Sequence, residues 1–194
     1  MTHLVSMSSN QYGLSKYAKE NLSNEEKWNG NNFEKGDMNT TLIRTKLGKT
    51  IMLQHDVTSP RPYSRLFTIS GTKGFAQKYP VKSMAFEPKA HRSITLEDIN
   101  DILLKYEPIV IKEIKNKAKQ IGGHGGMDYI MDYRLIYCLR NGLPLDQDVY
   151  DAAEWSSIVE LSKKSVNRSS KPMNIPDFTR GNWNLLHKVN YYLK

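Results

Sequence analysis

A histidine between two pairs of glycines is the first feature of this sequence that could do chemistry. Residues 121–133 read IGGHGGMDYIMDY, which places His124 just before a predicted helix, where free backbone amides favour an anion or a polar oxygen. His124 and Asp128 lie four residues apart, a spacing that metal ligands use, although no third ligand accompanies them. A hydrogen-bonded histidine in a joint between two helices explains the same residues, so three interpretations stay open.

A second candidate site is the segment 58–64, which reads TSPRPYS and lies between two predicted strands. Its two prolines stiffen the chain, so Arg61 and Tyr63 could be held outward on a rigid scaffold. An arginine and a tyrosine presented in this way can stack on a sugar and hydrogen-bond to it. The alternative is that the prolines only end an edge strand.

Tyrosines recur at helical spacing after the glycines, at positions 129, 133 and 137. Aromatic stripes of this kind are typical of helix packing. Only Tyr129, the phenol nearest the glycines, is a candidate ligand contact.

Several familiar catalytic signatures are missing from the sequence. No Gly-x-Gly-x-x-Gly follows a predicted strand, and neither a P-loop nor a Gly-x-Ser-x-Gly elbow occurs. The carboxylates of Glu154 and Glu160 fit a solvated helix face better than a glycosidase acid pair. The residues therefore predict neither a phosphate cradle nor a hydrolase serine.

The elements that must position these residues change type halfway along the chain. Segments rich in β-forming residues predict strands at 4–9, 39–45, 50–57, 64–70 and 75–79, with one helix at 13–21. Apolar residues at three- and four-residue spacing then predict helices at 95–105, 109–120, 127–140 and 146–162. Strands followed by helices favour an α+β fold, with an open, mainly antiparallel sheet and helices packed on one face.

The ends of these helices also have expected signals. Thr95 and Asp146 stand where N-caps are needed, and Gly122 and Gly142 stand where helices stop. After Val166 no period survives, so we expect one domain over residues 1–165 and an extended basic tail over residues 166–194.

Composition narrows the possible partners. The net charge is +8, but no nucleic-acid-binding motif accompanies it, and a solvated face with a basic tail explains the charge. No apolar run reaches the ~18 residues of a membrane helix, and the first residues lack a secretory signal. The single cysteine, Cys138, lies in an apolar periodic run and is expected to be a buried thiol.

Several long runs of the sequence together resemble one family. They are LVSMSSNQ, GDMNTTLIRTKLGKTIMLQHDVTSPRPYSR, SGTKGFAQKYP, GGHGGMDYIMDYRLIYCLRNGLPLDQDVYDAAEWSSIVELS and PDFTRG. In this order, over about residues 4–181, they are similar to glycoside hydrolase family 109, the NAD-dependent α-N-acetylgalactosaminidases. That family is part of the superfamily of glucose-fructose oxidoreductase and inositol dehydrogenase.

The resemblance implies a two-domain plan, in which an N-terminal Rossmann domain binds NAD and a C-terminal α+β domain receives the sugar. This chain looks like the second domain only, so we expect the Rossmann half, and with it the catalytic histidine and the cofactor site, to lie outside it. The nearest run to the family's histidine motif, Tyr79-Pro80-Val81-Lys82, lacks the histidine. Family members often carry an export signal at the far N-terminus, and the compartment of this protein stays undetermined.

The family's chemistry, as the resemblance implies it, is redox-neutral. NAD takes hydride from C3 of the sugar, a base removes the C2 proton, the leaving group is eliminated, water adds and the hydride returns. Tyr63 matches the family's substrate-contacting tyrosine, whereas Arg61 and His124 lie in matching runs without an assigned role. The expected partner is an α-linked N-acetylgalactosaminide, and no metal is expected.

Two other functions fit the same residues. A truncated or stand-alone domain could serve in oligomerisation or binding. For any form of this chain made alone, the sheet face that normally meets the Rossmann domain would be uncovered, so we expect an apolar patch, a homo-oligomer or poor solubility. A sugar dehydrogenase of the same superfamily would share the fold and differ in accumulating NADH.

Overall fold

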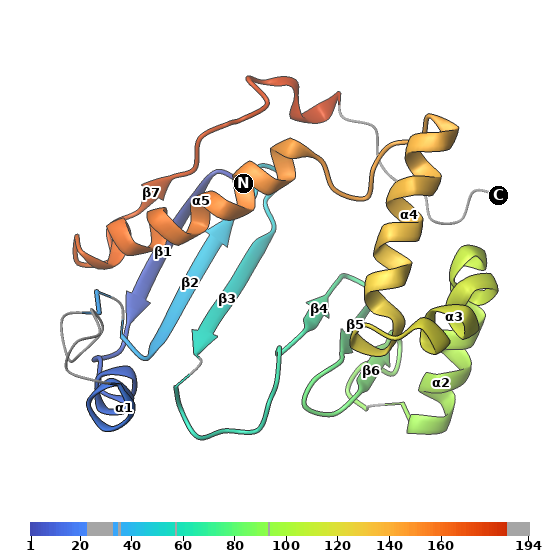
Figure 1. Ribbon diagram of the computed structural model, residues 1–194, viewed down its shortest axis with the longest axis horizontal. Helices are drawn as coiled ribbons and strands as arrows, with labels where there is room; N and C mark the ends of the chain where they lie inside the picture. Colours follow the sequence, from blue (N-terminus) through green and yellow to red (C-terminus); the bar gives the residue numbers. More distant parts are fainter. Residues whose placement is uncertain (23–32, 35, 57, 93, 186–194) are drawn as a thin grey trace. The chain divides into compact units, whose positions relative to one another are not determined.

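The computed structural model describes residues 1–22, 33–34, 36–56, 58–92 and 94–185. They form two compact units, which divide near residues 60 and 146: the first contains the described residues of 1–60 and 147–185, and the second those of 61–146. Each unit has its own antiparallel sheet (Figure 1).

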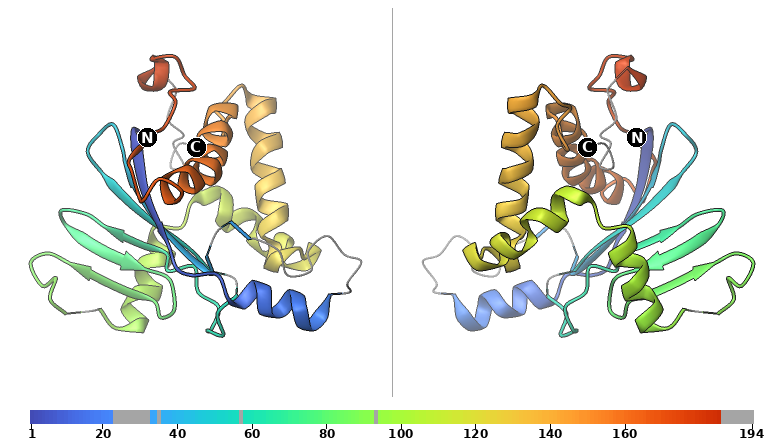
Figure 2. Two further views of the ribbon diagram at one scale, coloured as in Figure 1. Left: turned by 90° about the vertical axis from the view of Figure 1, so that its left-hand side faces the viewer. Right: turned by 90° about the vertical axis from the view of Figure 1, so that its right-hand side faces the viewer.

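The first unit is built on a four-stranded sheet in the order β3-β2-β1-β7. The strands are β1 (His3–Ser8), β2 (Met38–Arg44), β3 (Thr50–Asp56) and β7 (Met173–Asn174), and all neighbours are antiparallel. Helix α5 (Val149–Val166) lies on one side of this sheet (Figure 2). Helix α1 (Gly13–Asn21) and the short helix η2 (Asn182–Asn184) complete the unit.

Alternation along the strands explains why α5 packs on only one face of this sheet. Leu4 and Ile43 are buried and form a core with Ile175, against which Ile158 and Leu161 of α5 pack. Neighbouring residues point to the opposite face because successive side chains of a strand alternate. That face carries the row Val5, Leu42 and Met52, which are paired across the three strands.

A chain of buried polar groups also joins α5 to the sheet. The backbone amide of Ser6 donates to Oγ of Ser165 at 2.9 Å, and the Ser165 hydroxyl donates to the carbonyl of Lys171 at 2.8 Å. On the sheet side, the Ser6 hydroxyl bonds to Asn39 Oδ1 at 3.1 Å and to Thr41 Oγ1 at 2.9 Å. Strand β7 pairs only with His3 and Leu4, so Ser165 satisfies the amide that the short strand leaves free.

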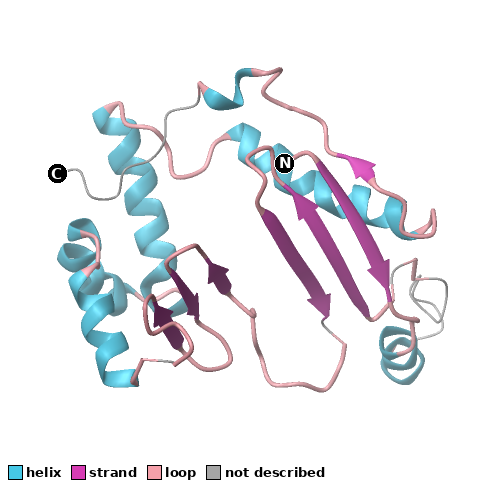
Figure 3. Ribbon diagram, turned by 180° about the vertical axis from the view of Figure 1, so that it is seen from behind, coloured by secondary structure: helices cyan, strands magenta, loops and turns pink. Residues whose placement is uncertain are grey.

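The second unit combines a three-stranded sheet with helices (Figure 3). Its strands are β4 (Thr68–Ser70), β5 (Gly74–Gln77) and β6 (Ser83–Phe86), in the order β4-β5-β6. Its helices are α2 (Leu96–Lys105), α3 (Ile109–Ile121), the short η1 (His124–Gly126) and α4 (Met127–Asn141). Helix α3 packs against α4, and α2 contacts β6.

The α+β class predicted from the sequence is confirmed, and the strands are divided between two sheets. The segment 57–67, which contains both prolines of the Arg61–Tyr63 loop, separates β3 from β4. The strand expected at 64–70 therefore shortens to Thr68–Ser70. The short strands β6 and β7 were not predicted, because neither has enough residues for a period to be recognised.

Three of the four predicted helix ends are confirmed. The Thr95 hydroxyl accepts from the Asp98 amide, and Gly122 and Gly142 end α3 and α4. The fourth, Asp146 as an N-cap, is wrong. Asp148 caps α5 instead, through a capping box with Asp151, while the Asp146 carboxylate accepts two hydrogen bonds from Arg134 at 2.7 and 3.1 Å.

Two further expectations concern Cys138 and the membrane. Cys138 is a free thiol and is buried, as its apolar surroundings predicted. Among the helices of the described residues, none has the length and hydropathy needed to cross a bilayer.

Candidate functional site

Tyr63 lies in the loop between β3 and β4, in the second unit, and is 70% exposed. The Nε–H of Arg65 donates a short hydrogen bond to its phenol oxygen. The ring of Tyr79 meets the Tyr63 ring edge-on, with centroids 6.0 Å apart and planes at 89°. This exposed tyrosine is therefore held at both its hydroxyl and its ring.

Two cations accompany the pair of tyrosines. The guanidinium carbon of Arg65 lies 5.8 Å from the centroid of the Tyr63 ring, and Lys78 Nζ lies 5.5 Å from that of Tyr79. The hydrogen bond to Tyr63 raises the pKa of Arg65, and the nearby Tyr63 and Tyr79 phenols add to this effect. Arg65 is therefore a cation at neutral pH, as a guanidinium is in general.

The sequence analysis singled out Tyr63 and missed Arg65 and Tyr79. The sequence contained a signal for Arg65: side chains two residues apart in an extended chain point to the same side, which predicts that Arg65 lies beside Tyr63. The sequence contained no such signal for Tyr79, because Tyr79 reaches Tyr63 through the turn that returns the chain from β4 to β5.

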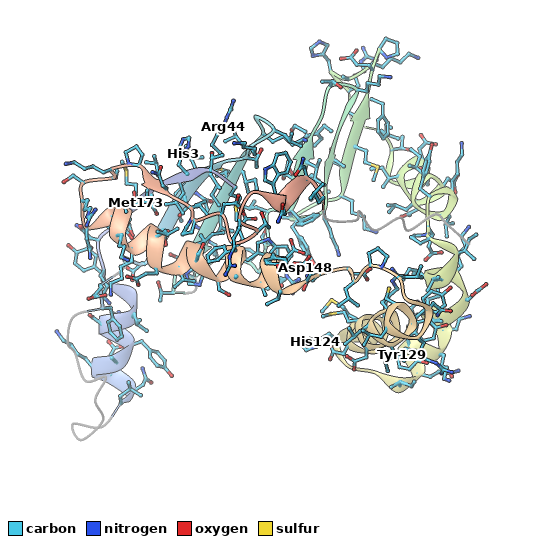
Figure 4. All side chains as sticks on the ribbon, turned by 90° about the horizontal axis from the view of Figure 1, so that it is seen from above. His3, Arg44, His124, Tyr129, Asp148 and Met173 are labelled. Atoms are coloured by element: carbon cyan, nitrogen blue, oxygen red, sulfur yellow. The ribbon has the colours of Figure 1, made fainter. Side chains whose placement is uncertain are left out.

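The run of residues 122–126 forms the joint between α3 and α4. All four glycines have positive φ, from 73° to 97°, and His124 has φ 49°. The Nδ1 atom of His124 lies 2.9 Å from the Asp128 carboxylate, which explains the spacing of four residues as a side-chain contact. His124 belongs to η1 and Tyr129 to the first turn of α4, and both are labelled in Figure 4.

Gly126 shows why this joint needs glycine. Its φ is 97°, and a Cβ atom there would stand 2.7 to 2.9 Å from backbone atoms of Ala118 and Lys119. Glycine therefore allows the start of α4 to approach the last turn of α3. The joint between helices, one of the three interpretations of this run, has a direct structural cause.

The geometry gives less support to the other two interpretations of His124, a metal site and a site for a polar ligand. In the described part of the chain, no cluster of three or more His, Cys, Asp or Glu side chains could hold a metal ion. The His124 side chain is 75% exposed and its described contact is with Asp128, so it could still meet a polar ligand through Nε2.

The tyrosine stripe of α4 lines a shallow hollow of about 480 Å³. The rings of Tyr133 and Tyr137 are nearly parallel, with centroids 6.2 Å apart, and Tyr129 follows at 6.3 Å from Tyr133. Lys117 of α3 lies 5.9 Å from the centre of the Tyr129 ring. The stripe is half-buried and packs along its own helix, and Tyr129 contacts α3.

The structure places the three predicted site residues in one unit, on two different segments of the chain. Arg61 and Tyr63 share the loop before β4, whereas His124 lies in the joint between α3 and α4. Within the described residues, Tyr63 makes a hydrogen bond with Arg65 and a ring contact with Tyr79, and the hydrogen-bond partner of His124 is Asp128.

A dinucleotide does not fit the glycines of this chain. A dinucleotide cradle needs a strand, a glycine-rich turn and then a helix, so that the pyrophosphate meets free amides at the helix start. Here the glycine run connects two helices, α3 and α4. The glycine run of residues 122–126 is therefore not a dinucleotide cradle.

Comparison with known proteins agrees with the resemblance found in the sequence. Residues 1–185 match the family model described as glycosyl hydrolase 109, C-terminal domain. Glycosyl hydrolase family 109 protein 2 of Phocaeicola vulgatus is 52% identical over 183 residues, which cover 94% of this chain and 44% of that protein. Alpha-N-acetylgalactosaminidase of Bacteroides fragilis is 51% identical over 187 residues, which cover 96% of this chain and 44% of that protein.

The chain thus spans less than half the length of these curated relatives. The family model nevertheless covers almost all of it, and the chain belongs to glycosyl hydrolase family 109, whose C-terminal domain it matches.

Proposed function

We propose that this chain is the C-terminal, substrate-binding part of a glycosidase that acts on α-linked N-acetylgalactosaminides. The observation that carries the proposal is 51% identity, over 96% of this chain, to a protein named alpha-N-acetylgalactosaminidase. The absence of a credible pair of catalytic carboxylates in the sequence agrees with a family whose chemistry does not use one.

Tyr63 is the residue that we propose contacts the sugar. Its side chain is exposed, its ring is held by Tyr79, and its hydroxyl is held by Arg65, so it can meet a ligand without first being ordered. Arg61, from the same loop, and His124 are proposed to line the same sugar pocket, without a defined role for either.

The cofactor of the proposed reaction is NAD, which the family resemblance implies. Because the glycine run of the described residues does not form a dinucleotide cradle, we propose that NAD is bound mainly by a Rossmann domain outside this sequence, in the same protein or in a partner. This chain would then contribute the surface that binds and orients the sugar, and no catalytic base.

The limits of the sugar-binding domain are part of the same proposal. We assign residues 1–165 to this domain and residues 166–194 to a basic tail. The described part of the tail is anchored, because Met173 and Asn174 pair with β1 and Ile175 is buried in the first core.

Hydrolysis of a chromogenic α-N-acetylgalactosaminide in the presence of NAD tests the proposal. The chain is assayed alone and after mixing with the N-terminal part of the Bacteroides fragilis relative. We expect no turnover from the chain alone and redox-neutral turnover from the mixture. Turnover by the chain alone would show that the proposed division of labour is wrong, and accumulation of NADH would indicate a sugar dehydrogenase instead.

A second candidate function is a non-enzymatic domain for oligomerisation or binding. It is favoured by the exposed apolar row on the sheet face opposite α5, in which Leu42 is 50% and Met52 62% exposed. Titration with NAD separates the two candidates. Thermal stabilisation of the chain by micromolar NAD would contradict both the second candidate and the absence of a cofactor site.

A further inference from the structure

The phenol of Tyr63 is constrained at its oxygen by a group that can only donate. The Nε–H of Arg65 points at the phenol oxygen, and a guanidinium carries no lone pair with which to accept a hydrogen bond in return. The hydroxyl hydrogen of Tyr63 must therefore point away from Arg65. Within the described residues, no acceptor takes that hydrogen, although the phenol stands exposed.

The ring of Tyr63 is constrained as well. The perpendicular contact with Tyr79 fixes the plane of the Tyr63 ring, and the guanidinium of Arg65 lies close to the same ring. A free phenol both donates and accepts, so it can pair with a sugar hydroxyl in either sense. A phenol whose oxygen already accepts a hydrogen bond, and whose ring packs against a neighbouring ring, offers its hydrogen.

We propose that Arg65 is a positioning residue that fixes Tyr63 as a hydrogen-bond donor to an oxygen atom of the bound sugar. The inference rests on the proposed function, because it takes an N-acetylgalactosaminide as the ligand. A positive charge on the acceptor side of the phenol polarises its O–H bond, which strengthens the hydrogen bond that Tyr63 donates. Arg65 acts through Tyr63 and needs no contact with the sugar.

Lys78 supplies a matched control for Arg65. It is also a cation beside a tyrosine ring of this cluster, at 5.5 Å, but its partner is Tyr79. A loss that arose only from the positive charge of the cluster would follow Lys78→Met as well as Arg65→Gln. A loss that arises from the hydrogen bond to the phenol follows only Arg65→Gln.

The first measurement needs no sugar. In a nitrogen-15 NMR spectrum of this chain, the Arg65 Nε–H signal, identified by its loss in Arg65→Lys, is expected to be protected from exchange with water. The substitution Tyr63→Phe is expected to remove this protection, and Lys78→Met is expected to leave it. An Arg65 signal that does not respond to Tyr63→Phe would overturn the proposal, whatever the sugar does.

The second measurement is a double-mutant cycle for binding of methyl α-N-acetylgalactosaminide to the same chain, followed by NMR titration. Loss of one hydrogen bond weakens binding by about fivefold to tenfold, which is the effect expected for Tyr63→Phe. We expect about threefold weakening for Arg65→Gln in the wild-type background and less than about 1.5-fold in the Tyr63→Phe background, because the two act as a unit. Lys78→Met is expected to bind like the wild type.

The outcomes separate this inference from the proposed function. Equal losses from Arg65→Gln in both backgrounds would show that Arg65 acts independently of Tyr63, which contradicts a positioning role. Absence of sugar binding by the wild-type chain, with the Arg65 signal protected, would contradict the proposed substrate surface and the donor role, while the contact between Arg65 and Tyr63 would stand.

Discussion

At the scale of single residues, the glycines around His124 shape the joint between α3 and α4 rather than form a reactive site. Five consecutive residues with positive φ reverse the chain between α3 and α4, and only glycine adopts such angles without strain. His124 is the one residue of this run that is not glycine, so the backbone strain falls on it. Its imidazole lies beside the Asp128 carboxylate at the first turn of α4. The sugar binding proposed for this protein rests instead on Tyr63, which Arg65 and Tyr79 hold in place.

The substitution Gly126→Ala tests the close approach of the two helices. It forces a Cβ atom against the backbone of Ala118 at a φ that alanine avoids, so we expect Tm to fall by roughly 5–10 °C in a thermal melt. Gly125→Ala is the matched control, because Gly125 has φ 73° but open space around it. It should cost only the strain, roughly 1 kcal/mol, and equal losses for the two variants would show that the clash is relieved.

At the scale of elements, helix α5 is attached to the sheet by both apolar and polar contacts. Ile158 and Leu161 pack on the core of Leu4, Ile43 and Ile175, and Ser165 adds a hydrogen bond to the buried amide of Ser6. The polar contact is needed because β7 is too short to pair with the whole of β1. The tail that follows α5 is held by the same serine, which donates to the carbonyl of Lys171.

The substitution Ser165→Ala tests this attachment. It leaves the buried amide of Ser6 and the carbonyl of Lys171 without their partner, which should lower the free energy of unfolding by about 1–3 kcal/mol in a urea titration. Ser157→Ala on the same helix is the control, since among the described residues the Ser157 hydroxyl bonds only to the carbonyl of Glu154 one turn earlier. The control should change stability by less than about 0.5 kcal/mol, and an equally small change for Ser165→Ala would contradict the role given to this contact.

At the scale of the whole molecule, each unit has its own sheet, and the first exposes an apolar row on the face that α5 does not cover. Val5, Leu42 and Met52 form this row, although the chain has a net charge of +8. Apolar side chains grouped in this way commonly mark a surface that another protein surface covers. Because the chain spans less than half of its relatives, we expect this face to associate when the chain is isolated.

Replacing Leu42 and Met52 together by lysine tests that expectation. Both side chains already face solvent, so the fold should persist while self-association, measured by light scattering after size-exclusion chromatography, decreases at every concentration. The control replaces Thr40 and Gln54, the next paired positions on the same face, by lysine. If the wild-type chain is monomeric at all concentrations, the row does not mediate association.

The sequence by itself determined the class of the fold, most helix ends, the family and the loop that carries Tyr63. These features are local: strand and helix periods, capping residues and the Pro-Arg-Pro-Tyr run are all written in neighbouring residues. Asp146 was mistaken for a cap because two aspartates near the start of α5 are equally suitable, and only the contact of Asp146 with Arg134 distinguishes them.

The tertiary structure alone decided which residues meet across the chain. Strand β7 has two residues, too few for any period, and is a strand only because β1 offers it an edge. Ser6 and Ser165 are 159 positions apart, and the pairing that buries them follows from packing α5 on the sheet. In the same way, the β4–β5 hairpin brings Tyr79 back to Tyr63. No local pattern encodes this contact, and it positions the ring on which the proposed sugar site depends.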